Sequence, residues 1–319
     1  MAKSKKNKQA IIPVLQGATT LAGRPINEVI QSTYNPFEKD AYTGVNSLQQ
    51  GQVKIISTND SLKYITDNGI ALLLYSMHLL TKATTELTKD GYKIEIPLKE
   101  YAAQCGFDVH NEDKAKAKAE LDAFRKIYKK AFAELDAIKL EWTENKGKNK
   151  GDYDARKIIV GDGLKKGVAY FIITPSIADI MISNNYITQI PRPAFNIGGR
   201  KGKSFYKKLL YKLSHHYNIN HNKENGSNNI LSIKTLLEWT TLPTVEHLKE
   251  INNRNYNDLI LEPLYEMLEQ YVTDGILTYW NTCGARKEPY TDEQKNNTPA
   301  EQQINEWYIH FEFAKEQQT

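Results

Sequence analysis

A chain of 319 residues that is 40% hydrophobic is long enough to bury a core, and its length favours about two domains. Its longest apolar run, at residues 70–80, is shorter than the roughly 20 residues of a membrane-spanning helix, and no apolar segment follows the basic N-terminus. These features argue against a membrane or secreted protein and predict a cytoplasmic one. Cys105 and Cys283 lie far apart without a CxxC partner, so neither a disulfide framework nor a zinc site is indicated.

Residues 1–54 are polar, with scattered Gly and Pro and little periodicity, and we expect a poorly ordered basic N-terminal segment. A first domain is predicted over residues 55–192. Its expected elements, in order, are a helix over 68–82, a strand over 92–97, a short helix over 98–107, a long helix over 112–138, a hairpin over 138–163 and a strand over 168–174. The long helix carries an apolar stripe made by Leu121, Phe124, Tyr128, Ala131, Leu135 and Ile138.

A composition break rich in Pro, Gly and positive charge places the domain boundary at residue 192. The second domain, 193–319, repeats the order of the first. We expect a helix over 204–220, a strand over 228–232, a short helix over 233–243, a long helix over 253–275, and two closing strands over 276–284 and 306–315 joined by a polar loop. This is an internal repeat of one supersecondary unit.

A short helix followed by a longer one and a small hairpin is typical of the winged variant of the helix-turn-helix motif. The order occurs twice in this chain. The predicted fold class is therefore α+β, with two tandem winged-helix domains related as an internal repeat and a flexible basic N-terminal tail.

Charge is distributed unevenly along the chain. The formal net charge of +4 is matched by four lysines at the N-terminus, Lys3, Lys5, Lys6 and Lys8. Residues 180–223 contain no acid and eight Lys or Arg side chains. A stretch whose charged side chains are all positive predicts an anionic partner. The alternative is a solvated basic face.

The chain resembles plasmid replication initiators of the iteron-binding Rep family, which have two winged-helix domains. The resemblance covers roughly residues 55–285 and is carried by four stretches, STNDSLKYITDNGIALLLYSM, IPLKEYAAQCGF, KSFYKKLLYKLSHHY and LEPLYEMLEQYVTDGILTYW. It implies a protein that binds repeated origin sequences in double-stranded DNA, forms a homodimer through the first winged helix, and recruits host replication proteins. The chain departs from the family at Pro263, which is expected to kink or restart the second long helix, and at residues 284–303, which enlarge the second wing.

The side chains predicted to read bases lie around the start of the second long helix. Arg can bond guanine bidentately and Asn can do the same for adenine, so this cluster suits the major groove. Lysines at the start of the first long helix, in the first hairpin loop, in the interdomain stretch and on the opening helix of the second unit are predicted phosphate contacts, with Lys208→Ala expected to weaken all sequences alike. The predicted DNA-binding residues are Lys114, Lys116, Lys118, Lys146, Lys148, Arg200, Lys201, Lys203, Lys207, Lys208, Lys212, Lys249, Asn253, Arg254, Asn255 and Asn257.

No residues are predicted to be catalytic or to bind a metal or cofactor. The stretch IGGRKGKS lacks the first Gly of a phosphate loop, because Ile197 stands in its place, so a basic linker is the preferred interpretation. His215, His216 and His221 lack further ligands for a metal. Two alternatives to an initiator remain: a winged-helix transcriptional or partition regulator, and a nucleotide- or metal-dependent nucleic-acid enzyme that uses GRKGKS.

Overall fold

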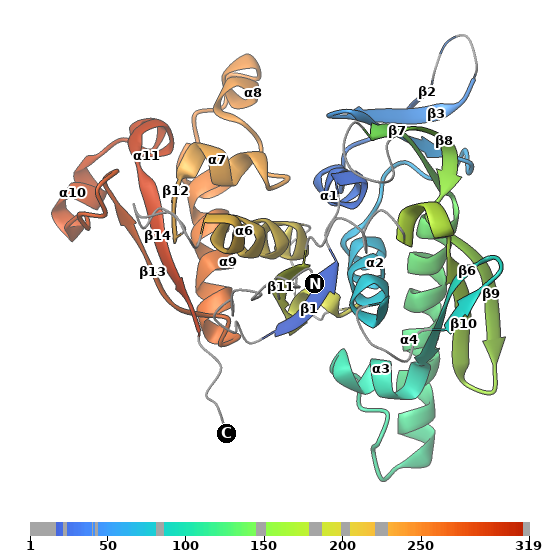
Figure 1. Cartoon of the computed structure of the whole chain (residues 1–319). Helices are drawn as coiled ribbons and strands as arrows, with labels where there is room; N and C mark the ends of the chain where they lie inside the picture. The colour runs from blue at the N-terminus through green and yellow to red at the C-terminus, as the bar shows by residue number, and fades with distance from the viewer. Residues whose placement is uncertain are drawn as a thin grey trace, which may run out of the picture.

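The computed structural model describes residues 17–21, 24–39, 41, 44–80, 86–144, 151–178, 187–198, 205–220 and 229–314. It is a mixed α+β fold in which the strands of these residues form small antiparallel sheets. Figure 1 shows two groups of elements, which we call the first unit (24–178) and the second unit (205–314). None of the described helices is both long and apolar enough to cross a bilayer.

The prediction of a poorly ordered segment over 1–54 is wrong for the part that the structure describes. This part contains α1 (Arg24–Gln31), which packs against two strands of a sheet. The strand β2 (Glu38–Lys39) pairs with β3 (Asn46–Gln50), and β3 pairs with β4 (Val53–Ser57). Short polar strands such as NSLQQ show no apolar alternation, and their order here comes from pairing with an apolar neighbour.

The helices predicted in the first domain are confirmed. They are α2 (Asp67–Leu80), α3 (Leu98–Gln104) and α4 (Lys114–Asp136). α2 is buried along most of its length, which explains its continuous apolar run. The stripe on α4 is also confirmed, since Phe124, Tyr128, Ala131 and Leu135 are all buried.

The predicted hairpin forms, but in a sheet other than expected. β7 (Ile138–Glu144) pairs with β8 (Gly151–Lys157) and also with β4, giving the order β2-β3-β4-β7-β8. A separate sheet has the order β5-β6-β10-β9. Its strands are β5 (Glu86–Thr88), β6 (Gly91–Pro97), β9 (Ile159–Lys165) and β10 (Val168–Ile173). The hairpin that completes the sheet of β6 is therefore β9–β10.

A two-stranded ribbon lies between the two units (Figure 1). β1 (Gly17–Leu21) pairs antiparallel with β11 (Ile187–Pro191), and a short 3₁₀ helix, η1 (Arg192–Phe195), follows. β1 packs against α2 of the first unit, while β11 packs against α6 (Tyr206–Asn220) of the second. Residues near the N-terminus thus contribute to the junction of the two units.

The second unit contains the elements expected from its sequence and three further helices. β12 (Ile230–Ser232) leads into the short helix α7 (Ile233–Glu238), where the Ser232 hydroxyl accepts a hydrogen bond from Thr235 N at 3.1 Å as an N-cap. The closing strands are β13 (Leu277–Cys283) and β14 (Tyr308–Phe313), and the sheet order is β12-β14-β13. The helices that were not expected are α8 (Val245–Glu250), α10 (Asp292–Asn297) and α11 (Ala300–Glu306).

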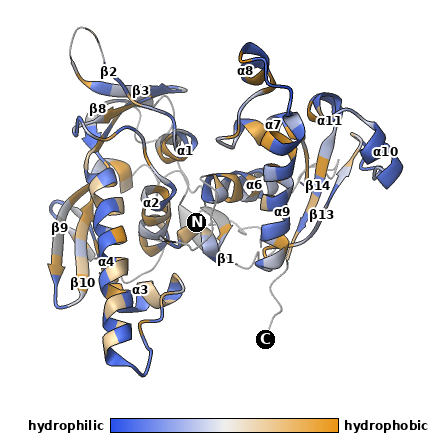
Figure 2. Cartoon of the chain, turned by 180° about the vertical axis from the view of Figure 1, so that it is seen from behind, coloured by the Kyte–Doolittle hydropathy of each residue, from blue (hydrophilic) through white to orange (hydrophobic). Residues whose placement is uncertain are grey.

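The loop expected to enlarge the second wing is thus partly helical. α10 begins at a capping box formed by Thr291 and Gln294, and none of its residues is buried. Figure 2 shows α10 as hydrophilic. Gln303 Nε2 on α11 donates to the carbonyl of Thr298 at 2.8 Å, and the Tyr290 and Trp307 rings stack at 4.2 Å between centroids. These contacts compensate for the small apolar area of α10.

The long helix of the second unit is interrupted near Pro263, as the sequence indicates. A π-helical segment, η3 (Asn257–Leu261), precedes α9 (Glu262–Thr273), and Pro263 occupies the first turn of α9. The apolar stripe nevertheless continues across the break, because Ile260, Leu264 and Tyr271 are all buried. The proline therefore marks a restart of the helix.

Candidate nucleic-acid interface

The outer surface of α4 carries a group of exposed lysines. Asp113 caps the helix, because its Oδ1 accepts hydrogen bonds from the backbone N–H groups of Ala115 and Lys116 at 2.8 and 3.3 Å. The predicted phosphate contacts Lys114, Lys116 and Lys118 are all exposed on the first turns.

The exposed lysines continue further along α4 than the predicted site. We define the lysine face of α4 as Lys114, Lys116, Lys118, Lys126, Lys129 and Lys130, all of which are exposed. Three of the four acids on α4 are held by other groups: Asp122 pairs with Arg125, Asp136 pairs with Lys157, and Glu134 accepts hydrogen bonds from Thr66. At about 1.5 Å per residue, the face extends over roughly 24 Å, close to the length of seven base pairs.

Two lysines of α6 are buried, contrary to the prediction that they contact phosphates. Lys207 and Lys208 are only 7% and 4% exposed. Lys207 Nζ donates to Asn68 Oδ1 at 3.2 Å, and Lys208 Nζ donates to the carbonyl of Thr33 at 3.3 Å. Buried ammonium groups cannot reach a phosphate on the surface. The prediction is corrected: these lysines join the second unit to the first.

Lys212, one turn further along α6, is half-buried. Its ammonium lies 5.8 Å from the centroid of the Trp239 ring, a cation–π distance. Burial lowers the pKa of Lys212 to about 8, although the Glu28 carboxylate opposes this shift. Lys212 is therefore less suited to a phosphate contact than the lysines of α4.

The buried lysines lie beside an equally buried acid. We call Thr33, Asp67, Asn68, Lys207 and Lys208 the inter-unit seam. Asp67 Oδ2 accepts from the backbone N–H of Lys207 at 3.3 Å, while Asp67 Oδ1 has no hydrogen-bond partner among the described residues. Burial raises the pKa of Asp67 to about 7, with the two lysines opposing the rise, and burial lowers the pKa of Lys208 to about 8.

The predicted base-reading cluster lies in a corner between α8 and η3 and not on one long helix. Thr244 caps α8, its hydroxyl accepting from His247 N at 3.1 Å. The helix ends in a Schellman motif: Asn253 N donates to Leu248 O at 2.8 Å, Asn252 N donates to Lys249 O at 3.0 Å, and Asn252 has a φ of 53°. In Figure 1, α8 projects from the second unit at the end away from the C-terminus.

Three predicted adenine readers in this corner make hydrogen bonds within the chain instead. Asn253 Oδ1 accepts from Asn255 N at 2.9 Å. Asn255 Nδ2 donates to Asp258 Oδ2 at 2.7 Å, and Asn257 Nδ2 donates to Glu262 Oε1 at 2.9 Å. Bidentate recognition of adenine needs both the oxygen and the amide nitrogen of an Asn side chain. The Asn253 side chain therefore supports the turn, and the side-chain amides of Asn255 and Asn257 are engaged by acidic side chains.

The remaining predicted residues of the corner differ in their partners. Arg254 is exposed, and its guanidinium makes no hydrogen bond or ion pair with any residue that the structure describes. Lys249 is also exposed, but its Nζ lies 2.5 Å from Glu301 Oε1 of α11. Arg254 is thus the predicted base reader that is available to a ligand.

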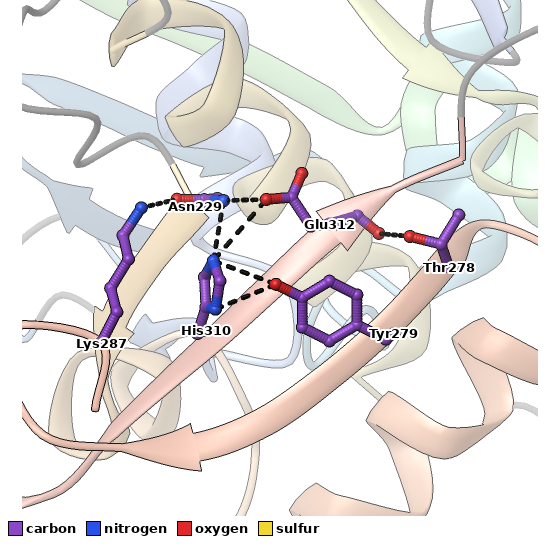
Figure 3. A network of polar contacts seen from close by, with 6 residues as sticks. All are labelled: Asn229, Thr278, Tyr279, Lys287, His310 and Glu312. Atoms are coloured by element: carbon purple, nitrogen blue, oxygen red, sulfur yellow. Dashed lines mark hydrogen bonds and ion pairs between the residues drawn. The ribbon is translucent and has the colours of Figure 1, made fainter. Parts of the chain in front are cut away.

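A polar network covers the outer face of the second unit's sheet (Figure 3). Asn229 is its centre: its Nδ2 donates to Glu312 Oε1 at 2.5 Å, and its Oδ1 accepts from Lys287 Nζ at 2.6 Å. His310 Nδ1 lies 3.0 Å from Tyr279 OH. The network ties the loop that contains Lys287 to the edge strand β12, and sequence reasoning gave no signal for it.

Other sequence candidates give no chemical site in the described chain. Lys146, Lys148, Arg200, Lys201 and Lys203 lie outside the described residues, as does most of IGGRKGKS. The described residues contain no group of three or more His, Cys, Asp or Glu side chains placed to hold a metal ion. Cys105 and Cys283 are both buried free thiols.

Comparison with known proteins does not identify a family for this fold and surface. No protein-family model matches the chain, and no curated protein matches it significantly.

Proposed function

We propose that this protein is a sequence-specific double-stranded DNA-binding protein that initiates replication of a plasmid or similar element. In this proposal it binds repeated origin sequences and recruits host replication proteins, as the resemblance to the iteron-binding Rep family implies. It acts by binding, without catalytic chemistry of its own.

The observation that carries the proposal is a strand order that occurs twice. In the first unit a helix, strand β6, a short helix and a long helix precede β9 and β10, and the sheet order is β6-β10-β9. In the second unit the same succession leads to the order β12-β14-β13. Both follow the pattern of a winged helix-turn-helix, in which a short helix braces a longer one beside a hairpin. This supports two winged-helix units, the first with β9–β10 as its wing and β7–β8 as an insertion.

The two units contribute different contacts in the proposal. The lysine face of α4 supplies phosphate contacts, which give affinity and position without reading sequence. Arg254 supplies a base contact, because an exposed guanidinium with no partner among the described residues can bond guanine O6 and N7. The exposed face of α9 carries Glu262, Glu266 and Glu269, which phosphates would repel, so the α8–η3 corner and not the middle of α9 approaches the DNA.

A homodimer through the first unit is also part of the proposal. β9 lies at an edge of its sheet and exposes Val160 and Leu164, at 43% and 39%. An exposed edge strand with apolar side chains is a surface on which a second copy can add a strand.

The test is a salt titration of binding by the full chain. Duplexes with the repeats beside its gene are compared with random duplexes of equal length. We expect specific binding to exceed non-specific binding by at least roughly 10³-fold at physiological salt. A ratio below about ten would contradict specific recognition.

Two substitutions separate the contact types. Arg254→Ala is expected to cost ~1–3 kcal/mol at one base position, with little change on random DNA. Lys118→Ala should weaken both duplexes alike and lower the salt slope by about 0.9. The exposed Arg156 of β8 serves as the matched control for Arg254, and Arg156→Ala should leave the specificity ratio unchanged. Whether binding leads to initiation is read from replication of an origin-bearing plasmid in cells that supply only this gene.

A further inference from the structure

An aliphatic side chain is exposed at the tip of the α8–η3 corner. Ile251 is 56% exposed, and it is the one apolar residue in the run KEINNRN. It follows α8 directly as the C-cap residue, and its neighbours Asn252 and Arg254 are exposed as well. An isolated exposed Ile is common on protein surfaces, so its meaning depends on how the corner holds it.

The corner is built to hold Ile251 and Arg254 in fixed relative positions. The Schellman motif fixes the backbone on both sides of Asn252, whose left-handed conformation an Asn adopts more readily than a branched residue. The side chains of Asn253 and Asn255 then fix the next turn through hydrogen bonds at 2.9 and 2.7 Å. Ile251 and Arg254 therefore project from one rigid turn, three residues apart.

We propose that Ile251 is a second specificity-determining residue, which contacts the C5-methyl group of a thymine next to the guanine bound by Arg254. The inference rests on the proposed function. The thymine methyl is the apolar group that the base edges present in the major groove, and aliphatic side chains contact it there. The side chains of Asn253 and Asn255 are engaged in hydrogen bonds within the chain, so Ile251 and Arg254 are the apolar group and the cation that this corner offers to bases.

The test uses the full chain and the duplex of highest affinity that it selects from a random-sequence library. Each thymidine of that duplex is replaced in turn by deoxyuridine, which removes only the methyl group. For the wild-type protein we expect a loss of affinity of roughly fourfold at one position, the factor that corresponds to one buried methylene. At that position Ile251→Ala should bind the thymidine and deoxyuridine duplexes equally.

Leu87→Ala is the matched control, because Leu87 is 65% exposed on β5 and belongs to the first unit. This variant should keep the full deoxyuridine penalty. A specific duplex with no position sensitive to deoxyuridine would overturn the inference and leave the proposed function standing. If Ile251→Ala keeps the loss of affinity on deoxyuridine, the inference is also overturned while the proposed function stands, and Ile251 would be assigned to a protein partner or to solvent. Failure of the library to yield any preferred sequence would overturn the proposed function, and the inference with it.

Discussion

Asp67 is a buried acid whose pKa is raised by its surroundings in the fold. Its carboxyl group lies in the inter-unit seam and is faced by Lys207 and Lys208 of α6, Tyr271 of α9, and Tyr34. Removal from water disfavours the carboxylate more than the two lysines favour it, so its pKa rises to about 7. Removal from water acts in the opposite direction on Lys208, whose pKa falls to about 8.

These two shifts contribute slopes of opposite sign to the stability on either side of neutral pH. Between pH ~4 and the raised pKa of about 7, folded Asp67 keeps a proton that the unfolded chain has released, so the free energy of unfolding falls as pH rises. From the lowered pKa of Lys208, about 8, up to pH ~10, the unfolded chain keeps a proton that the folded chain has lost. The free energy of unfolding rises with pH across that second window. Each group can contribute a slope of at most ~1.4 kcal/mol per pH unit.

Asp67→Asn tests the acid side of this profile. The amide keeps an oxygen that can accept from Lys207 N, but it does not titrate. In urea unfolding measured from pH 4.5 to 9, we expect the fall that Asp67 contributes below pH 7 to disappear, so the variant should gain stability relative to the wild type as the pH rises to 7. The exposed Asp60 provides the control Asp60→Asn, which should leave the fall intact. An unchanged slope in Asp67→Asn would assign it to another group.

Sequence reasoning at this scale identified charges correctly but could not say what covers them. Lys118 and Lys208 both lie on helices next to further lysines, and both were predicted to contact phosphates. Lys118 is exposed, whereas Lys208 is only 4% exposed, because the first unit covers the side of α6 on which Lys208 lies. Arg254 is exposed, as a base contact requires, whereas Asn253, Asn255 and Asn257 are engaged in hydrogen bonds of a turn that the sequence did not predict.

At the scale of single elements, the long helices were predicted from their sequence pattern and the short helices were not. The stripes of α2, α4 and α9 are long enough for a helical period to be visible, and all three helices form. α8, α10 and α11 have six or seven residues each, too few for a period, and their formation depends on caps such as Thr244 and Thr291. The predicted hairpin β7–β8 joins the sheet of β4 and not that of β6, which could not be foreseen because a hairpin pattern does not tell which other strand the hairpin joins.

Pro263 leads to a prediction about an element. Without an N–H it cannot donate to the carbonyl four residues earlier, and the π-helical turn of η3 lies at that place. Pro263→Ala restores a donor, so we expect the turn to relax towards an α-helix and to rotate the corner that carries Arg254. Stability should fall by only ~0.4–1 kcal/mol, the usual effect of a looser unfolded chain.

The readout for Pro263→Ala is the ratio of specific to random duplex binding, which should fall by more than the small stability change explains. Pro299→Ala is the control, because Pro299 precedes α11 and lies outside the corner. An unchanged ratio in Pro263→Ala would show that the π-helical turn does not position Arg254.

At the scale of the whole molecule, contacts between distant segments place the two units against each other. The β1–β11 ribbon joins residues 17–21 to residues 187–191, and α2 packs against α6. Such pairings cannot be inferred from periodicity, since they join segments that lie far apart in the sequence. A ligand that touches both α4 and the α8–η3 corner would depend on this placement.

Asn68 holds the seam from the first unit, and its removal tests the placement. Its Oδ1 accepts from Gly198 N at 2.8 Å and from Lys207 Nζ at 3.2 Å, so Asn68→Ala leaves a buried ammonium and a backbone N–H without this acceptor. Hydrogen bonds to charged groups contribute ~1.5–3 kcal/mol, and we expect a loss of that size in urea unfolding. Asn46→Ala removes a half-buried Asn whose hydrogen bond to Asp60 O is exposed to solvent, and it should cost less than ~0.5 kcal/mol. Because the seam joins the units, Asn68→Ala should also weaken specific DNA binding at temperatures where each unit remains folded. Full affinity in the destabilised variant would show that each unit binds DNA independently of the other.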